Sequence, residues 1–274
     1  MQRRSRRRCP VLLNKRPFVY SSKVMKSDFA IFLEYCQTLF GRDWESIDDL
    51  LHFHRPAPAT PEQLAAVRSL WPGYKLPIAY VDYLEQMGRS SGRLRLFFDA
   101  PDNVADLLAY VERSRVNEQG FAPARCVVLT APGLSGGRGL LYDTPESEPR
   151  LVTVQWDEVV RVESSSFVNF LFQQVWTRRW FLEGHPLTTR LPSAVGQEQV
   201  LQWLRQRSFV RANLPLAAAA HDPIWNGYEH EATRILMDQS DETLFVHIVS
   251  ENPDALLDTV QSFQRAFGLS ELNR

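Results

Sequence analysis

Four short apolar runs between positions 126 and 162 limit the fold more than any other feature of the sequence. The runs are CVVLT (126–130), GLLYD (139–143), LVTVQ (151–155) and VVRV (159–162). Each is rich in β-branched or aromatic residues and is followed by Gly, Pro, Ser or acidic residues, which is typical of strands. Because parallel neighbours need crossovers of a dozen residues or more, connections this short predict an antiparallel meander.

Apolar residues recur at helical spacing on both sides of these runs. Helices are expected over 27–41, 60–71, 76–88, 101–115, 166–176 and 197–207, and in a closing segment that ends at Gly268. Thr60 is a good N-cap, Pro61 and Pro77 suit first turns, and Gly88 suits a C-terminal stop. We also expect a strand at LRLFF (94–98) and a hairpin formed by 232–237 and 243–249. Together these elements predict an α+β fold with a mainly antiparallel sheet flanked by helices.

Two segments rich in proline and small residues, HRPAPAT (54–60) and HPLTTRLPSAVG (185–196), indicate boundaries. They predict a basic tail that is expected to be disordered (1–26), an N-terminal helix with its linker (27–56) and a main domain (57–184). A small α+β C-terminal unit (190–274) completes the division, and its size is close to that of a minimal domain.

Charge is distributed unevenly along the chain. Residues 1–26 contain nine of the 31 Lys and Arg residues and no acid, which leaves 22 basic against 32 acidic residues in 27–274, a net charge of −10. The basic tail favours either contact with nucleic acid or a plain disordered extension. The acidic body argues against a nucleic-acid binder and suits a basic protein partner.

The sequence favours a cytoplasmic protein. No window approaches the ~18 consecutive apolar residues of a membrane span, and the apolar run at Val11-Leu12-Leu13 is too short for a signal peptide. Cys9, Cys36 and Cys126 are odd in number and follow no metal-ligand pattern. We therefore expect neither a disulfide framework nor a membrane contact.

The glycine-rich stretch APGLSGGRGLLYD (131–143) contains a G-x-S-x-G pattern around Ser135. A nucleophile elbow needs a helix after the serine, but the run that follows has the pattern of a strand. A phosphate-binding loop would also lead into a helix, and the Walker lysine is missing. We favour a hairpin turn, with a catalytic Ser135 and a ligand-cradling loop as alternatives.

Other candidate chemical groups have simpler interpretations. His52-x-His54 has no further ligand nearby, and HEATR (230–234) lacks the second histidine of a zincin helix. The pairs Asp48-Asp49 and Glu146-x-Glu148 suit solvated loops better than acid–base catalysis. Tryptophans at helical spacing are expected in the core, although some could anchor a partner. The sequence thus predicts a protein that is not an enzyme and that needs no metal or cofactor.

The run TPEQLAAVRSLWPGYKLPIAYVDYLEQMG resembles the opening of the SUKH superfamily. The matching pattern is a helix, a short gap, and Leu-Pro-x-x-Tyr leading into a second helix that ends near a glycine. Its positions here are Leu76, Pro77, Tyr80, Leu84 and Gly88. The resemblance continues through the Gly136-Gly137 turn, the 141–143 strand, the Trp156 segment and the helix around Phe167, Phe170 and Leu171, and covers about residues 57–180.

This resemblance implies a single antiparallel sheet flanked by helices and a non-catalytic function. SUKH proteins are bacterial immunity proteins that bind and neutralise a polymorphic toxin, often a nuclease, and include a fungal cell-wall regulator. The resemblance therefore implies an immunity protein with a toxin domain, such as a basic nuclease, as partner; the alternative is a scaffold or regulatory interaction module. Protection that survives deletion of 190–274 would favour the first function.

The family pattern does not fix the interface or the oligomeric state. We expect partner contacts in an exposed loop with Arg89, Ser90, Ser91 and Arg93, and at a hairpin tip with Ser135 and Arg138.

Overall fold

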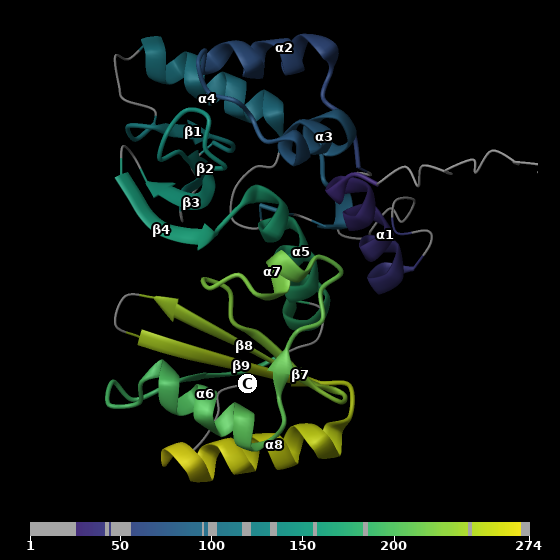
Figure 1. Cartoon of the computed structure of the whole chain (residues 1–274), viewed down its shortest axis with the longest axis vertical. Helices are drawn as coiled ribbons and strands as arrows, with labels where there is room; N and C mark the ends of the chain where they lie inside the picture. The colour runs from purple at the N-terminus through teal and green to yellow at the C-terminus, as the bar shows by residue number, and fades with distance from the viewer. Residues whose placement is uncertain are drawn as a thin grey trace, which may run out of the picture.

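The computed structural model describes residues 26–41, 44, 56–94, 96–97, 103–116, 122–131, 136–155, 158–182, 186–240 and 243–269. It confirms the predicted α+β fold, with two antiparallel sheets and helices around each. Figure 1 shows one sheet in the upper half of the molecule and the other in the lower half, with α5 and α7 between them.

The first sheet is the predicted meander, in the order β1-β2-β3-β4 with every pair antiparallel. Its strands are β1 (Cys126–Val128), β2 (Gly137–Leu141), β3 (Arg150–Gln155) and β4 (Glu158–Ser164). Leu140 faces Val127 on one side and Leu151 on the other, so the middle of the sheet is apolar and buried. The pairing of β3 with β4 shifts register twice, which leaves β4 as an irregular edge strand.

Five helices pack around this sheet: α1 (Asp28–Phe40), α2 (Pro61–Leu70), α3 (Ile78–Met87), α4 (Val104–Val116) and α5 (Phe167–Thr177). Three of them begin at a capping side chain, including the predicted cap at Thr60. Ser27 accepts a hydrogen bond from Ala30 N, and Ser166 accepts one from Asn169 N. Thr60 and Gln63 form a reciprocal capping box at the start of α2.

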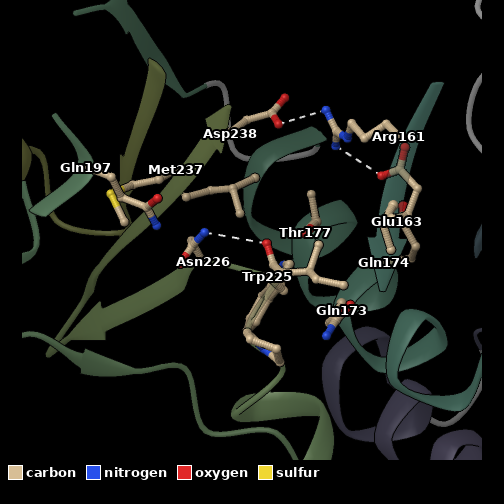
Figure 2. A pocket seen from close by; sticks show the side chains of 14 residues that line it. Arg161, Glu163, Gln173, Gln174, Thr177, Gln197, Trp225, Asn226, Met237 and Asp238 are labelled. Carbon is tan, nitrogen blue, oxygen red and sulfur yellow. Dashed lines mark hydrogen bonds and ion pairs between the residues drawn. The ribbon is translucent and has the colours of Figure 1, made fainter. Parts of the chain in front are cut away.

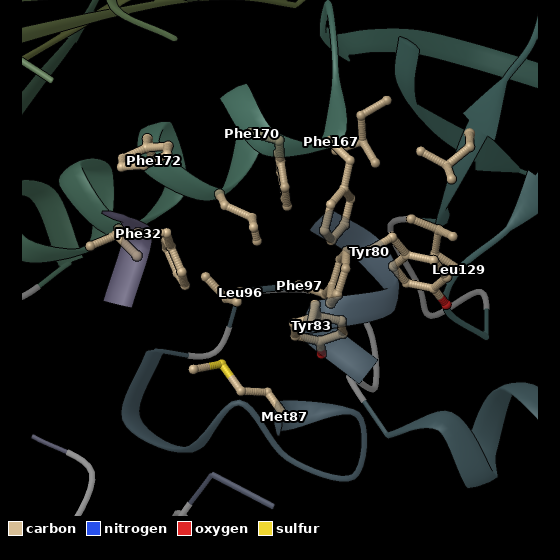
Figure 3. Close-up of a cluster of buried hydrophobic side chains, with 14 of the residues drawn as sticks. Phe32, Tyr80, Tyr83, Met87, Leu96, Phe97, Leu129, Phe167, Phe170 and Phe172 are labelled. Carbon is tan, nitrogen blue, oxygen red and sulfur yellow. The ribbon is translucent and has the colours of Figure 1, made fainter. Parts of the chain in front are cut away.

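Aromatic rings fill the space between α1, α3 and α5 (Figure 3). The ring of Phe167 lies 5.2 Å from Tyr80 and 6.0 Å from Tyr83, and Phe97 stacks on Phe170 at 5.8 Å. Most residues of helix α5 are buried. On the side of α1, the ring of its Phe172 lies 5.7 Å from that of Phe32. Helix α5 is therefore the central support of the structure.

The 94–98 strand is a wrong prediction in its described part. Leu94 ends a 3-10 helix, η1 (Gly92–Leu94), and Leu96 and Phe97 lie in bends. Leu94, Leu96 and Phe97 are buried, but Leu96 N donates to Ser91 Oγ at 3.1 Å rather than to a strand. The apolar character of this run therefore reflects burial of a loop.

Two expected helix ends also differ in detail. Pro77 is the N-cap of α3 rather than part of its first turn. Gly88 ends α3 with right-handed backbone angles, so a left-handed stop is not the reason for a glycine there. A Cβ at Gly88 would lie 2.6 Å from Leu84 O and 2.9 Å from Ala59 Cβ, so close packing requires the glycine.

The second sheet has the order β5-β9-β8-β7-β6, again antiparallel. Its strands are β5 (Leu187–Arg190), β6 (Val210–Arg211), β7 (Gly227–His230), β8 (Thr233–Ser240) and β9 (Thr243–Ser250). The predicted hairpin is present as β8 and β9. The segment 185–196, expected to be a boundary, contains β5, which pairs with β9 at one edge of the sheet.

The second sheet has one buried face and one face that is buried only in part. Ile235, Val246 and Ile248 belong to a core cluster with α6 (Gln197–Gln206) and α8 (Pro253–Phe267). On the other side, residues of the C-terminal unit join the core of the first: Ala212, Leu214, Ala219, Ala220, Trp225 and Val249. A π-helical turn, η2 (Arg178–Leu182), and the short α7 (Ala217–Ala220) lie at this junction. The C-terminal unit therefore has a core of its own and also contributes side chains to the core of the first unit.

Gly136, at the end of the β1–β2 connection, is required by its backbone. Its φ is +91°, and a Cβ there would lie 2.6 Å from Val154 O. We expect Gly136→Ala to lower the free energy of unfolding by about 1–3 kcal/mol, measured by urea denaturation. Gly196→Ala is the control, since Gly196 has φ −82° and no atom within 4 Å of a built Cβ. Equal effects of the two substitutions would contradict this role.

Candidate functional site

The loop predicted to contact a partner is not exposed throughout. Arg89 is exposed and its Nε donates to Pro58 O at 2.7 Å, but Ser90 is half-buried and pairs with Ala57. Ser91 is 0% exposed, which corrects the expectation that it is available for contact. The loop is buried because it packs against 56–58, where a Cβ on Gly92 would lie 2.6 Å from Pro56 Cδ. The side chain of Arg93 lies outside the described residues.

Arg138 lies inside the strand ladder rather than at a hairpin tip. It belongs to β2 opposite Thr153, and its N donates to Thr130 Oγ1 at 2.9 Å. Its Nε and Nη1 are buried without a hydrogen-bond partner among the described residues. Ser135 lies outside the described residues, but the segment that contains it joins β1 to β2. A strand therefore follows Ser135, as expected for a hairpin connection.

A concavity lies where the two units meet. A cleft of about 540 Å³ is bounded by β4, the last turns of α5, the 223–226 loop and β8 (Figure 2). Its lining is rich in polar side chains and also contains apolar ones. The lining residues are Arg161, Val162, Glu163, Gln173, Gln174, Thr177, Gln197, Pro223, Ile224, Trp225, Asn226, Leu236, Met237 and Asp238. Its volume is in the range of ligand-binding pockets.

Charged side chains form a bridge across one edge of the cleft. Arg161 of β4 contacts Asp238 of β8 at 3.0 Å and Glu163 at 3.0 Å, and Figure 2 shows it between the two carboxylates. The Thr153 hydroxyl donates to the other oxygen of Glu163. Burial lowers the pKa of Arg161, but the two carboxylates outweigh it and raise the pKa overall. Two carboxylates against one guanidinium leave this edge with a net charge of −1.

Side-chain amides and hydroxyls line the rest of the cleft. Gln174, Gln197 and Thr177 approach it from α5 and α6, while Asn226 Nδ2 donates to Ile224 O at 3.5 Å (Figure 2). Gln173 is 1% exposed and its Nε2 donates to Ala219 O at 3.1 Å, which fixes the inner wall. Amide groups both donate and accept hydrogen bonds, so this lining can bind a polar main chain.

A buried carboxylate holds the cleft walls together. Asp222 is 1% exposed, and its Oδ2 accepts from Ser164 Oγ at 2.8 Å and from Ser165 N and Oγ at 2.9 Å. Its Oδ1 accepts from Ile224 N at 3.0 Å. Burial by itself raises the pKa of Asp222, but these hydrogen bonds outweigh it and leave the pKa below its usual value. The carboxylate thus joins the start of α5 to the 223–226 loop.

Asp222, Arg161 and Asp238 were not predicted as site residues. The expected helix over 166–176 is present as α5, but the sequence around it does not indicate the carboxylate that binds Ser164 and Ser165. The pairing could not be found locally, because Asp222 is 57 residues from Ser165 and Asp238 is 77 residues from Arg161.

The described histidines and the Glu146-x-Glu148 pair do not line this cleft. His247 is half-buried in β9 beside Thr188 Oγ1 at 2.9 Å, and burial lowers its pKa. Burial raises the pKa of Glu148, which lies near Lys75 outside the cleft. His52, His54 and Asp48-Asp49 lie outside the described residues. Among the described residues, no three His, Cys, Asp or Glu side chains form a group that could hold a metal ion.

Tryptophans are mostly core residues, as expected. Trp71, Trp176, Trp203 and Trp225 are buried and Trp180 is half-buried, while Trp156 lies outside the described residues.

None of the described helices is long and apolar enough to cross a membrane.

Comparison with known proteins gives no match: no family model matches the sequence, and no curated protein or solved structure is significantly similar to it. The likeness to the SUKH superfamily therefore rests on the sequence pattern described above.

Proposed function

We propose that this chain is a non-catalytic binding protein, an immunity protein that neutralises a cognate toxin by direct binding in the bacterial cytoplasm. The observation that carries the proposal is the order of elements in 57–182, where α2, α3, α4, the four-stranded meander and α5 follow one another. That order is the one that the SUKH-like sequence pattern implies. The net charge of −10 on 27–274 supports a basic partner, because complementary charge raises the rate of encounter.

The test is neutralisation of a toxin encoded beside the gene. Toxin domains from neighbouring genes are expressed in a sensitive host with or without the full chain, and growth is measured. The proposal expects one toxin to be neutralised by the full chain and by Ser135→Ala alike. Growth inhibition by every neighbouring toxin domain in the presence of the chain would contradict it.

The alternative, a scaffold or regulatory interaction module, is favoured by the C-terminal unit. This unit adds Trp225, Val249 and other side chains to the main core, so deletion of 190–274 would expose that core. Loss of protection after the deletion would then follow from unfolding. Substitutions in the cleft are a cleaner test, and recovery of envelope-synthesis proteins by the full chain would favour the scaffold.

A further inference from the structure

We propose that the cleft at the junction receives an extended, basic segment of the partner protein, which adds as a strand to the open edge of β4. This inference rests on the proposed function for the identity of the partner. The strand addition itself can be tested without that identity.

Strand β4 can form further main-chain hydrogen bonds along one of its sides. It pairs with β3 on one side, and no hydrogen bond joins its main chain to another described segment on the other side. An edge strand presents unpaired N–H and C=O groups that can pair with another chain. The lining that includes Arg161, Val162 and Glu163 places this strand at the wall of the cleft. In Figure 1, β4 is the strand of the first sheet nearest to the second sheet.

The free edge of β4 has an irregular shape. Register shifts leave Val160 and Glu163 without a residue directly opposite on β3. Val160 is 57% exposed, so an apolar side chain is presented at the edge. Bulges of this kind re-aim side chains and, with charged neighbours, discourage unspecific strand pairing. A strand that adds here must therefore carry charges complementary to those beside Val160.

The charges beside this edge favour a basic segment. Glu163 and Asp238 share the single guanidinium of Arg161, so the edge accommodates a further cation better than a further anion. The acidic body as a whole has the same preference. Gln174, Gln197 and Asn226 supply amides for the main chain of the added segment (Figure 2). Main-chain hydrogen bonds give such strand additions affinity, and side-chain contacts give them specificity.

The direct test uses two synthetic peptides of about eight residues, the length of a typical strand. Both alternate threonine and valine and have capped ends; one has a central arginine and the other a glutamate. Each is titrated into the full chain while amide shifts and hydrogen exchange are recorded. We expect roughly tenfold slower exchange at outward amides of 158–164 and roughly tenfold tighter binding of the arginine peptide. Absence of any change in β4, or changes centred on β5 or β6, would overturn the inference.

Matched variants locate the contact. Val160 and Val210 are both exposed valines on edge strands, one in each sheet. Val160→Pro removes an N–H from β4 and is expected to weaken the arginine peptide roughly tenfold, whereas Val210→Pro leaves its affinity unchanged. Val160→Lys and Val210→Lys repeat the comparison without altering the main chain. Equal affinity in both pairs would overturn the inference.

Other occupants give different results. Exchange in β4 that is slow before any peptide is added, and fast after residues 1–25 are removed, would assign the edge to the chain's own basic segment. Protection that increases with protein concentration would assign it to a second copy. Either result overturns the partner assignment.

The partner experiment separates this inference from the proposed function. Capture of a neighbouring toxin domain by the full chain and by Val210→Lys, but not by Val160→Lys, supports both proposals. Capture by all three proteins overturns the β4 contact and leaves the function standing. Peptide binding at β4 without capture of any toxin domain supports the edge contact and contradicts the function.

Discussion

Trp225→Ala is expected to lower the free energy of unfolding of the chain by about 3–5 kcal/mol, the usual cost of removing a buried aromatic side chain. Trp225 is 8% exposed and its ring meets that of Trp176 edge-on at 5.1 Å. It belongs to the C-terminal unit but packs in the core of the first unit. The measurement is urea denaturation followed by far-UV circular dichroism and by fluorescence.

Two controls make this result specific. Trp225→Phe keeps an aromatic ring and removes an indole N–H that has no partner among the described residues, so we expect a loss below about 1.5 kcal/mol. Ile78→Ala alters a side chain that is 71% exposed and is expected to have little effect. If Trp225→Ala proved as mild as Ile78→Ala, the shared core between the units would be refuted.

Asp222→Ala is expected to lower the free energy of unfolding by about 2–4 kcal/mol at neutral pH. The substitution leaves the main-chain N–H groups of Ser165 and Ile224 without their acceptor in a buried site. Asp222→Asn retains one carbonyl oxygen and should have a smaller effect. Glu198→Ala is a suitable control, because Glu198 is an exposed carboxylate in a surface ion pair with Arg205. Equal losses for Asp222→Ala and Glu198→Ala would contradict the proposed clamp.

The same carboxylate gives a pH dependence of defined sign. Hydrogen bonds hold the pKa of Asp222 below its usual value in the folded state. Its contribution to stability is therefore fully present above the unfolded pKa of about 3.9 and is lost as pH falls through the lower folded value. The stability difference between the wild type and Asp222→Asn should be constant near neutral pH and shrink below about pH 4. A difference that grows on acidification would contradict this assignment.

Local sequence predicts the elements of this fold well where the signal is local. Ser27, Thr60 and Ser166 cap helices because their side chains reach N–H groups three residues ahead. The meander follows from short connections between apolar runs, and it is present as β1 to β4. These features need no information from distant parts of the chain.

Elements that depend on distant partners were missed or mistaken. Strand β5 lies between Pro186 and Pro192 and looks like a linker, because its partner β9 is more than fifty residues away. The 94–98 run looks like a strand because it is short and apolar, whereas Leu96 and Phe97 fill the core from a loop. Ser91 looks like a loop residue open to solvent, but its hydroxyl is used inside the fold.

The candidate site was hardest to anticipate for the same reason. It combines Arg161 and Glu163 of the first sheet with Asp238 of the second, and Asp222 fixes the distance between them. Individually these residues resemble ordinary surface charges. Only the packing of the C-terminal unit against the first unit places them at one cleft.

We propose that the chain neutralises a toxin by binding it directly. The most direct measurement is isothermal titration of the purified full chain with each toxin domain encoded beside its gene, at low and at high salt. We predict stoichiometric binding to one basic domain, with an affinity that falls as salt screens the acidic body. Absence of heat with every neighbouring toxin domain, at either salt concentration, would contradict it.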